Sequence, residues 1–381
     1  MSNKKKIFYI WKSAYPWDVR IEKICSALVE FGFETYIICL WDGEEKQEEN
    51  INGINILRVG FNQNKRNYLP IPFNPNWKKS IEQYIKLIKP DLIINREIIL
   101  ADISGKLAKK YEIPIIMDMA ENYPAAMKLW KKYSDSLVKK LIYHQIDMPK
   151  WLEKKSLEMM DGVIVVCDEN GERIRNEYNY DNYIETIYNT PSLNFFNFKK
   201  FEQERDYITI SYHGYINTER NLDKVLSVGS KFNNLKFDIW GDGVLLEELK
   251  SKFAKFDNIT FYGAYKLENL NNIIQSTDIG ILPYSLNDHI HNTLSNKMFD
   301  YMACGIPVLT SQAKSMVNFI DKYDIGYYFD FEDENNIEKT FSKLNSLDWA
   351  AKAKNGLKAF QSEFNWENDK TKLREFLERF I

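Results

Sequence analysis

Apolar and polar positions follow one another along the chain in a repeated rhythm of short strands and longer helices. Apolar runs at 5–11, 33–41 and 51–59 have the length of buried strands, whereas 18–30 and 101–112 place apolar residues three or four positions apart, as amphipathic helices do. Strands that alternate with helices form parallel sheets that helices cover. The pattern therefore predicts an α/β fold.

The same rhythm restarts in the second half of the chain, beginning with the apolar run at 208–214. The stretch LNFFNFKKFEQERD at 193–206 shows neither period and is interpreted as a connector. Because 381 residues exceed the usual size of one compact domain, we expect two, at 1–198 and 207–365.

A strand, loop, helix, strand unit at 278–311 holds the clearest candidate chemistry. DIGILPY is apolar enough for a buried strand, and Asn292, Thr293 and Ser295 favour the start of a helix that ends before Gly305. A loop that enters a helix in this way directs unpaired backbone N–H groups and the positive end of the helix dipole at one spot. Such a spot suits a phosphate.

Lys297 and Asp300 share the polar face of this predicted helix, whereas Phe299, Met302 and Ala303 share the apolar face. A spacing of three residues fits an ordinary exposed ion pair, which stabilises a helix by only ~0.2–0.5 kcal/mol. The alternative is that both side chains face a ligand at the mouth of the loop. Spacing alone leaves both interpretations open.

The overall composition excludes several functional classes. The formal charge of −3 argues against a generally basic nucleic-acid binder. The four cysteines lie in apolar segments without metal-like spacing, which indicates reduced core residues. Because no apolar run reaches the length of a membrane span, we expect a cytoplasmic protein rather than a secreted or membrane-spanning one.

Residues 125–160 are predicted to form a long helical region without strand signals, in which lysines are interleaved with aromatic residues such as Trp130, Tyr133 and Tyr143. A basic, aromatic helix can lie on an anionic bilayer, with lysines near the headgroups and aromatic rings at the interface. A solvated helix on the surface of a domain fits the pattern equally well. Membrane contact through 125–155 is therefore one of two open interpretations.

Several motifs resemble those of the GT-B-type glycosyltransferases of family 4, a retaining class that uses nucleotide sugars and includes enzymes of bacterial surface-polysaccharide biosynthesis. The resemblance covers most of the chain. It rests on YHGYINTERNLDKVL, FDIWGDG, FYGAY, LENLNNIIQSTDIGILPYS and above all NKMFDYMACGIPVL, together with YPWDVRIEKICSAL and DMAENYP in the first half. It implies two facing Rossmann-like domains, with the C-terminal helix at 366–381 packing back on the first.

The resemblance also implies that the second domain binds the donor and the first domain the acceptor. Asp300 falls where the family holds the ribose hydroxyls, and Arg220 and Lys297 would neutralise the departing diphosphate. The further positions implied for donor binding are Gly214, Gly241, Ala264, Tyr265, Asn292, Thr293, Leu294 and Ser295, and those implied on the acceptor side are Asp18, Asp118 and Tyr123.

Two departures from the family pattern concern the donor side. Relatives commonly carry two glutamates separated by seven residues, but Asn292 and Asp300 stand at these positions. The donor sugar would therefore meet an amide where many relatives offer a carboxylate. Tyr215 stands where an arginine commonly follows the glycine of the first phosphate loop.

A third departure concerns the acceptor side. Ala120 stands where many relatives carry a histidine near the reacting sugar. Glu121 or Asp118 would orient the acceptor hydroxyl instead, and Glu121 is grouped with Arg220 and Lys297 as a candidate catalytic residue.

The histidines do not predict a metal site. His289 and His291 have no further candidate ligands nearby in sequence, and no Asp-x-Asp motif occurs. A lone histidine such as His213 is more often a structural hydrogen-bonding residue than a ligand-binding one. We expect metal-independent transfer, in which Arg220, Lys297 and a helix terminus replace a cation.

These observations predict a retaining glycosyltransferase that moves a hexosyl or N-acetylhexosaminyl unit to a hydroxyl of a glycan or lipid-linked acceptor. The donor would be a nucleoside-diphosphate sugar, with a UDP-sugar favoured over a GDP-sugar, and no cofactor is expected. Two alternatives remain: a non-catalytic nucleotide-sugar-binding subunit, and a sugar-nucleotide epimerase with the same two-domain architecture.

Overall fold

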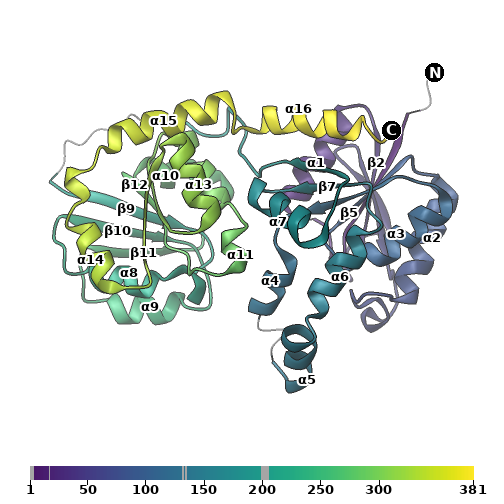
Figure 1. Ribbon diagram of the computed structural model, residues 1–381, viewed down its shortest axis with the longest axis horizontal. Coiled ribbons are helices and arrows are strands. Elements are labelled where there is room, and N and C mark those ends of the chain that lie inside the picture. Colours follow the sequence, from purple (N-terminus) through teal and green to yellow (C-terminus); the bar gives the residue numbers. More distant parts are fainter. Residues whose placement is uncertain (1–3, 17, 131–132, 134, 199–205) are drawn as a thin grey trace. The chain divides into compact units, whose positions relative to one another are not determined.

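The chain folds into two compact units, each built on its own sheet (Figure 1). The first unit comprises Met1–Ile187 with Lys370–Ile381, and the second comprises Tyr188–Asp369. No helix in the described part of the chain is long and apolar enough to cross a bilayer. The computed structural model describes residues 4–16, 18–130, 133, 135–198 and 206–381.

The sheet of the first unit has eight strands in the order β3-β4-β2-β1-β5-β6-β7-β8. All neighbouring strands are parallel except β3 and β4. Their bounds are β1 (Lys6–Ile10), β2 (Glu34–Leu40), β3 (Glu48–Ile51), β4 (Ile54–Val59), β5 (Leu92–Arg96), β6 (Ile115–Met119), β7 (Gly162–Val165) and β8 (Tyr183–Thr186).

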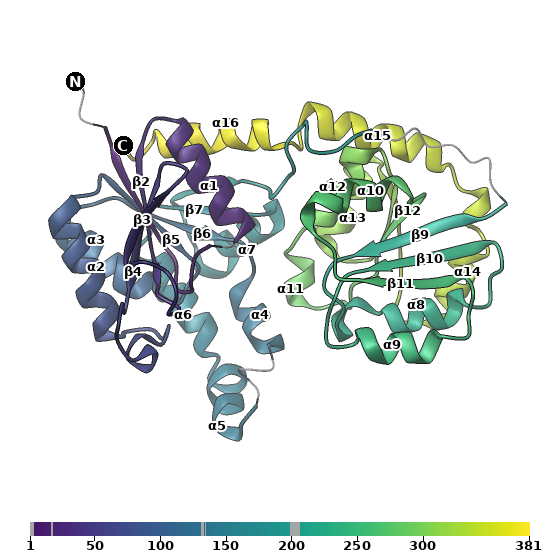
Figure 2. The same cartoon turned by 180° about the vertical axis from the view of Figure 1, so that it is seen from behind.

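Helices follow the strands of this sheet as the apolar period predicts. α2, α3 and α6 lie side by side, whereas α1 packs against β2 and β4 (Figures 1 and 2). Asp18 caps α1 by accepting hydrogen bonds from the backbone N–H groups of Arg20 and Ile21. The helices are α1 (Val19–Glu30), α2 (Pro75–Ile88), α3 (Ala101–Tyr111), α4 (Tyr123–Leu129), α5 (Leu137–Lys140), α6 (Met148–Leu157) and α7 (Asp168–Tyr178).

The prediction of a single strand at 51–59 is wrong. The segment contains a turn at Asn52 and Gly53, and β3 and β4 form an antiparallel hairpin around it. Both turn residues have positive φ, 52° and 86°. Asn-Gly is the pair that tolerates this conformation best, and it is a strong hairpin signal that outweighs the apolar run.

The helical region predicted at 125–160 consists of several separate helices rather than one continuous helix. α4, α5 and α6 are separate, and a π-helical turn at Leu141–Gln145 follows α5. α6 begins after Asp147, which has a left-handed backbone with φ of 54°, and carries Pro149 in its first turn. A proline lacks the N–H that a continuous helix requires, so the chain must interrupt the helix there.

The sheet of the second unit is entirely parallel and has six strands in the order β11-β10-β9-β12-β13-β14. Its strands are β9 (Ile208–His213), β10 (Leu235–Trp240), β11 (Ile259–Gly263), β12 (Ile279–Leu282), β13 (Val308–Ser311) and β14 (Gly326–Phe329). This arrangement agrees with the predicted restart of the strand and helix rhythm.

Figures 1 and 2 show α8 and α9 on one side of β9, β10 and β11, with α10, α12 and α13 on the other side. As predicted, α12 ends before Gly305, whose φ of 69° relieves the cap. The helices are α8 (Leu222–Gly229), α9 (Leu246–Phe253), α10 (Leu270–Gln275), α11 (Asp288–His291), α12 (Asn296–Cys304), α13 (Lys314–Tyr323), α14 (Glu334–Phe341) and α15 (Trp349–Ser362).

The observed division of the chain differs from the predicted boundaries at 198 and 366. Residues 188–198 belong to the second unit, where they are hydrogen-bonded to the start of α16 (Trp366–Leu377). The backbone N–H of Trp366 donates to the carbonyl of Pro191 at 3.0 Å, and Thr190 donates to the carboxylate of Asp369 at 2.6 Å.

Apolar side chains in the later part of α16 and just beyond it contribute to the first unit. Leu373, Phe376 and Leu377 are at most 1% exposed. A Cβ atom built on Gly162 of β7 would lie 2.9 Å from the ring of Phe376 and 2.7 Å from that of Phe380. Gly162 therefore leaves the space that these two rings occupy.

Candidate functional site

The candidate site lies at the ends of two central strands of the second unit. β9 and β12 are neighbours, and the chain proceeds from β9 to β10 on one side and from β12 to β13 on the other. Ligands of open α/β sheets usually bind at the carboxyl ends of strands where the strand order reverses in this way. Gly214 and Arg220 lie on the loop after β9, and Lys297 lies in the first turn of α12.

Gly241 lets the backbone loops at this edge approach one another closely. The N–H of Gly214 donates to the carbonyl of Trp240 at 2.9 Å, and the N–H of Gly241 donates to the carbonyl of Gly263 at 2.8 Å. A Cβ atom on Gly241 would lie only 1.8 Å from the carbonyl oxygen of Gly214. A larger residue at Gly241 would therefore separate the loops that form the floor of the site.

The side chain of Lys297 extends directly over this floor. A Cβ atom on Gly214 would lie 2.4 Å from Cε of Lys297. The φ of Gly214 is 122°, a conformation that residues with a side chain rarely adopt. Gly214 thus has a specific reason to be glycine, because it allows the backbone turn and leaves room for the lysine.

Two cations meet at the site without a carboxylate partner among the described residues. The guanidinium carbon of Arg220 lies 4.4 Å from the ring centroid of Tyr284, and Nζ of Lys297 lies 5.7 Å from the ring centroid of Tyr212. Nε of Arg220 is buried and has no hydrogen-bond acceptor among the residues that the structure describes. Aromatic faces offset little of a full positive charge, so this arrangement attracts an anion.

The electrostatics of Tyr284 report the same positive potential. Burial alone would raise the pKa of its hydroxyl, but the nearby charges of Lys297 and Arg220 outweigh burial and lower that pKa. The hydroxyl also shares a hydrogen bond of 2.7 Å with Oγ of Ser295. Ser295 is the N-cap of α12, but its side chain makes no capping bond. The first amides of α12 therefore have no side-chain cap.

The polar side chains before α12 mostly hold their own loop together. Asn292 donates through its side-chain amide to the carbonyl of Asp288 at 2.8 Å, and Thr293 donates to the carbonyl of His289 at 2.9 Å. Leu294 is buried. The side chains of these three predicted residues therefore shape the loop that leads into α12.

Asp300, one turn after Lys297, faces the end of β9. Its Oδ2 lies 3.3 Å from Nε2 of His213, and Nδ1 of the same ring lies 3.1 Å from the hydroxyl of Tyr301. Burial lowers the pKa of His213 even though Asp300 favours its charged form. The ring centroid of Tyr265 lies 6.4 Å from that of His213, and Ala264 next to it is exposed.

Sequence reasoning missed the tyrosines of this site and its second histidine. Tyr212, Tyr284 and Tyr301 read along the chain as apolar core residues, because each stands in or beside a strand or helix face. His289 is half-buried, and its Nδ1 has no hydrogen-bond partner within the described part of the chain. Burial, together with the charge of Arg220, lowers the pKa of His289 to about 4.

The predicted acceptor-side residue Asp118 lies in the first unit and is completely buried. It accepts hydrogen bonds from the hydroxyl of Tyr9 at 2.6 Å, from Nε of Arg20 at 2.8 Å and from Nη1 of Arg96 at 2.8 Å. Burial alone would raise the pKa of Asp118, but Arg20 and Arg96 outweigh it and lower the pKa to about 2. Its carboxylate is thus occupied by protein partners.

The other first-unit candidates lie near this buried group with different exposures. Asp18 caps α1, and its Oδ2 lies 3.8 Å from Nη2 of Arg96. Tyr123 is buried at the start of α4, and Glu121 is half-buried between β6 and α4. Only Asp18 and Glu121 of the four predicted first-domain residues therefore present a partly exposed side chain.

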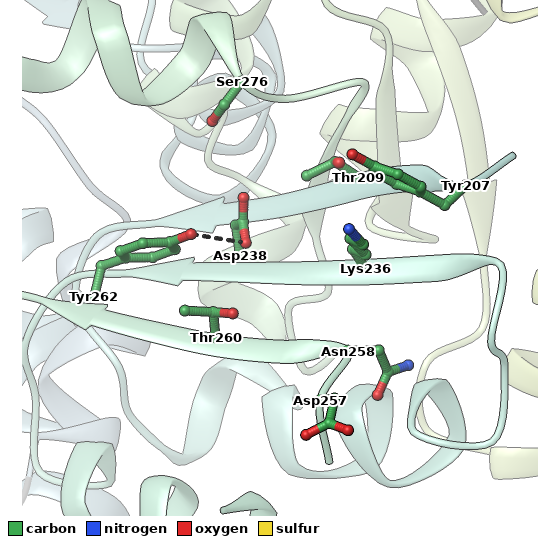
Figure 3. A pocket seen from close by; sticks show the side chains of 9 residues that line it. All are labelled: Tyr207, Thr209, Lys236, Asp238, Asp257, Asn258, Thr260, Tyr262 and Ser276. Carbon is green, nitrogen blue, oxygen red and sulfur yellow. Dashed lines mark hydrogen bonds between the residues drawn. The ribbon is translucent and has the colours of Figure 1, made fainter. Parts of the chain in front are cut away.

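A separate polar concavity of about 310 Å³ lies on the sheet face of the second unit rather than at its strand ends (Figure 3). Figure 3 shows Asp238 and Tyr262, which are joined by a hydrogen bond of 3.3 Å. The side chain of Asn258 donates to three backbone carbonyls and is therefore structural. This concavity contains neither the glycine loops nor the cations described above.

Two sequence-family models match the chain, one in each half. The model described as Glycosyltransferase Family 4 matches residues 18–193, and the model described as Glycosyl transferases group 1 matches residues 210–346. The chain is a glycosyltransferase of the family 4 type. A comparison with curated protein sequences finds no match. Among the described residues, no group of three or more histidine, cysteine or acidic side chains could hold a metal ion.

Solved structures share the fold of this glycosyltransferase over its whole length. Sucrose-phosphate synthase from Thermosynechococcus elongatus has a TM-score of 0.78 at 15% identity and covers 99% of each chain. HepE from Anabaena, in complex with UDP, has a TM-score of 0.71 at 12% identity, covering 98% of this chain and 100% of its own. A glycosyltransferase from Rickettsia africae has a TM-score of 0.69 at 15% identity, covering 99% and 98%. The predicted GT-B fold is confirmed.

Proposed function

We propose that this glycosyltransferase moves a sugar from a nucleoside-diphosphate sugar to a hydroxyl of a glycan or lipid-linked acceptor. The observation that carries the proposal is the pair of cations at the N-terminus of α12, Arg220 and Lys297, which face tyrosine rings and have no carboxylate partner in the part of the chain that the structure describes. A diphosphate supplies the missing negative charge, and the charge on it increases as the sugar departs. Interactions that strengthen in this way accelerate the reaction.

Different residues of the second unit would bind different parts of the donor. Arg220 and Lys297 would bind the diphosphate together with the first amides of α12. Asp300 would accept hydrogen bonds from the ribose hydroxyls, and the backbone at Ala264 and Tyr265 would contact the base. We favour uridine as the base, in keeping with HepE, a protein of similar fold that was solved with UDP and with UDP-glucose.

We further propose that transfer retains the anomeric configuration and needs no metal. The departing diphosphate would be stabilised by Arg220 and Lys297, and the acceptor hydroxyl would attack from the same face of the sugar. Glu121 remains the proposed residue that orients this hydroxyl. NMR of the donor and of the product gives the anomeric configuration of each, and the comparison tests retention. Full activity in the presence of EDTA is the expected result for metal independence.

The donor site is tested by nucleotide binding and by turnover of a UDP-sugar panel with membrane lipid extract as the acceptor. Lys297→Ala and Asp300→Ala are expected to lose at least ~10-fold in UDP affinity, since each removes a charged hydrogen-bonding group. Lys354→Ala, at an exposed position of α15, is the matched control and should behave as the wild type. Unchanged affinity in both site variants would remove this assignment.

The same assay separates the two alternative functions from transfer. Stoichiometric UDP binding without turnover, across a broad panel of donors and acceptors, identifies a non-catalytic binding subunit. Conversion of the free UDP-sugar without any acceptor identifies an epimerase. Acceptor-dependent release of UDP is the outcome expected for the glycosyltransferase.

We also propose that the first unit contacts an anionic membrane, through aliphatic side chains that are more exposed than the aromatic ones predicted from the sequence. Leu137 and Val138 of α5 are 85% and 66% exposed, and Ile146 is 65% exposed. In contrast, the ring of Tyr133 stacks on that of Tyr143 with centroids 4.5 Å apart. Figures 1 and 2 show α5 standing away from the sheet of its unit.

The lysines of this region contribute less free charge than their number indicates. Lys128 pairs with Asp147 and Lys139 with Asp135, both at 2.8 Å. Lys131 and Lys132, which belong to the predicted pattern, lie outside the described residues. Apolar insertion should therefore account for much of the binding, with the remaining lysines adding salt-dependent attraction.

Sedimentation with phosphatidylglycerol vesicles tests the membrane contact. The double substitution Leu137→Asp and Val138→Asp is expected to abolish sedimentation at moderate salt, whereas Lys354→Ala should leave it unchanged. Equal sedimentation of the double variant and the wild type would show that these residues do not contact the membrane. Absence of wild-type binding at both low and moderate salt would remove the membrane contact altogether.

A further inference from the structure

The hydrogen bonds of Tyr301 determine which nitrogen of His213 carries a proton. The hydroxyl of Tyr301 lies 2.7 Å from the carbonyl oxygen of Ser211, and a carbonyl can only accept, so the single hydroxyl proton points to Ser211. The hydroxyl oxygen can then only accept from Nδ1 of His213, which is 3.1 Å away. Nδ1 must therefore carry a proton.

This assignment creates a conflict on the other side of the ring. Nε2 of His213 lies 3.3 Å from Oδ2 of Asp300. In a neutral ring whose proton is on Nδ1, Nε2 presents a lone pair, and an ionised carboxylate presents only lone pairs. The contact becomes a hydrogen bond only when one further proton lies between the two atoms, as an imidazolium with a carboxylate or an imidazole with a carboxylic acid.

We propose that His213 is a positioning residue for Asp300, and that it acts by taking up this proton when the nucleotide binds. The proton comes from solvent, ends on Nε2, and no other bond is made or broken. The protonated ring would hold Oδ2 of Asp300 in place and keep the carboxylate ionised to accept the ribose hydroxyls. This inference rests on the donor site proposed above.

The surroundings of His213 explain why the proton should arrive with the nucleotide. The charged and titratable groups that face the ring are Asp300, Tyr301 and Lys297 of α12, together with Tyr265 after β11. Burial and the charge of Lys297 lower the pKa of His213, and Asp300 opposes them. A bound diphosphate would offset the charge of Lys297, which raises the pKa of His213 and favours its protonation.

The consequence is a coupling between nucleotide affinity and pH. In the free protein the pKa of His213 lies below its ordinary value, and in the complex it is higher, so binding takes up a fraction of a proton between these two values. UDP affinity should then weaken as the pH rises through this range. A histidine that only fills space would produce no such dependence.

Calorimetric titration of UDP in buffers of different ionisation enthalpy measures this proton uptake at pH 6.5. His213→Gln is the key variant, because its amide N–H can point at Asp300 where Nε2–H would, but does not titrate. The wild type is expected to take up more protons than His213→Gln, which also corrects for the ionisation of UDP itself. Equal uptake in the two proteins would overturn the proposal.

Affinities at pH 6 give a second measurement. His213→Gln should remain within ~3-fold of the wild type, whereas His213→Ala should lose ~10-fold because no donor then holds Asp300. Circular dichroism confirms that both variants are folded. Equal affinities of His213→Ala and His213→Gln would show that no hydrogen bond to Asp300 is needed.

An NMR titration without nucleotide tests the pair independently of the proposed function. The ring signal of His213, assigned by its loss in His213→Gln, should titrate at lower pH in Asp300→Asn than in the wild type, because the carboxylate that favours the charged ring is gone. An unchanged pKa would overturn the inference. If UDP failed to bind while this shift was observed, the proposed donor site would fail and the proton-sharing pair would stand.

Discussion

Both units place two cations beside tyrosine side chains at the carboxyl ends of parallel strands, but among the described residues only the first unit supplies a buried acid to its pair of cations. Arg20 and Arg96 both contact Asp118, which is completely buried. Arg220 and Lys297 face tyrosine rings and have no carboxylate partner among the described residues. A group whose charges the protein itself neutralises stabilises the fold, whereas a group left positive requires an external anion.

The largest expected effect comes from removing Asp118, the buried acid that contacts Arg20 and Arg96 in the first unit. Asp118→Asn leaves two buried arginines without their counter-charge, so we expect the free energy of unfolding to fall by about 3–5 kcal/mol in urea denaturation. Asp181→Asn, at an exposed position of the same unit, is the control and should change it by less than ~0.5 kcal/mol. If Asp118→Asn were as stable as this control, the contacts of Asp118 with Arg20 and Arg96 would not stabilise the fold.

Lowering the pH should weaken the interactions of Asp118 with Arg20 and Arg96 in a defined range of pH. The pKa of Asp118 is lowered to about 2 in the folded chain, below the ordinary value of about 3.9. Its contribution to stability is therefore complete above pH ~4 and is lost as the pH falls toward ~2, a change of about 2 kcal/mol. Unfolding measured from pH 5 to 2 should show this loss in the wild type, and a parallel loss in Asp118→Asn would contradict the assignment.

The pair of cations in the second unit, Arg220 and Lys297, should respond differently: removal of one of them should weaken ligand binding rather than destabilise the fold. Arg220→Ala is expected to weaken UDP binding ~10-fold or more and to change the free energy of unfolding by less than ~1 kcal/mol, because no buried acid loses its partner. Arg20→Ala in the first unit should instead destabilise the fold. Calorimetry measures the UDP affinity of the two variants, and urea denaturation measures their free energy of unfolding. A strong destabilisation by Arg220→Ala would contradict the proposed difference between the two units.

The smallest effect concerns the floor beneath Lys297. Gly214→Ala introduces a Cβ atom 2.4 Å from Cε of Lys297 at a φ of 122°. We expect a stability loss of roughly 1 kcal/mol and a several-fold weaker UDP affinity as the lysine shifts. Gly32→Ala is a useful comparison, since its φ is also positive but no atom of the described residues lies within 4 Å of the added Cβ atom. Equal UDP affinity in both variants would show that Lys297 does not depend on Gly214.

The sequence predicted the elements whose signals are local. The strand and helix at 278–311, the helix predicted at 18–30 and the end of α12 before Gly305 all follow from residues within a few turns of one another. The hairpin at Asn52 and Gly53 depends on equally local residues, but the apolar run around it predicts a single strand. These features needed no knowledge of the rest of the chain.

The partners of the charged residues could not be predicted in the same way. Asp118 contacts Arg20, which is 98 residues away, and His213 contacts Asp300, which is 87 residues away. A charge pattern along the chain does not reveal which cations are neutralised. The spacing of Lys297 and Asp300 fits an ordinary surface pair, and only the fold places Gly214 beside Lys297 and His213 beside Asp300.

The chain's own order of apolar and polar residues was thus sufficient for the α/β rhythm, the restart in its second half and the motifs of the family, because backbone conformation depends on near neighbours. Which polar groups are satisfied internally depends on sheet order, on burial and on distances across strands. For that reason folding alone separates the buried Asp118 from the Arg220 and Lys297 pair, and makes the second a place for a ligand.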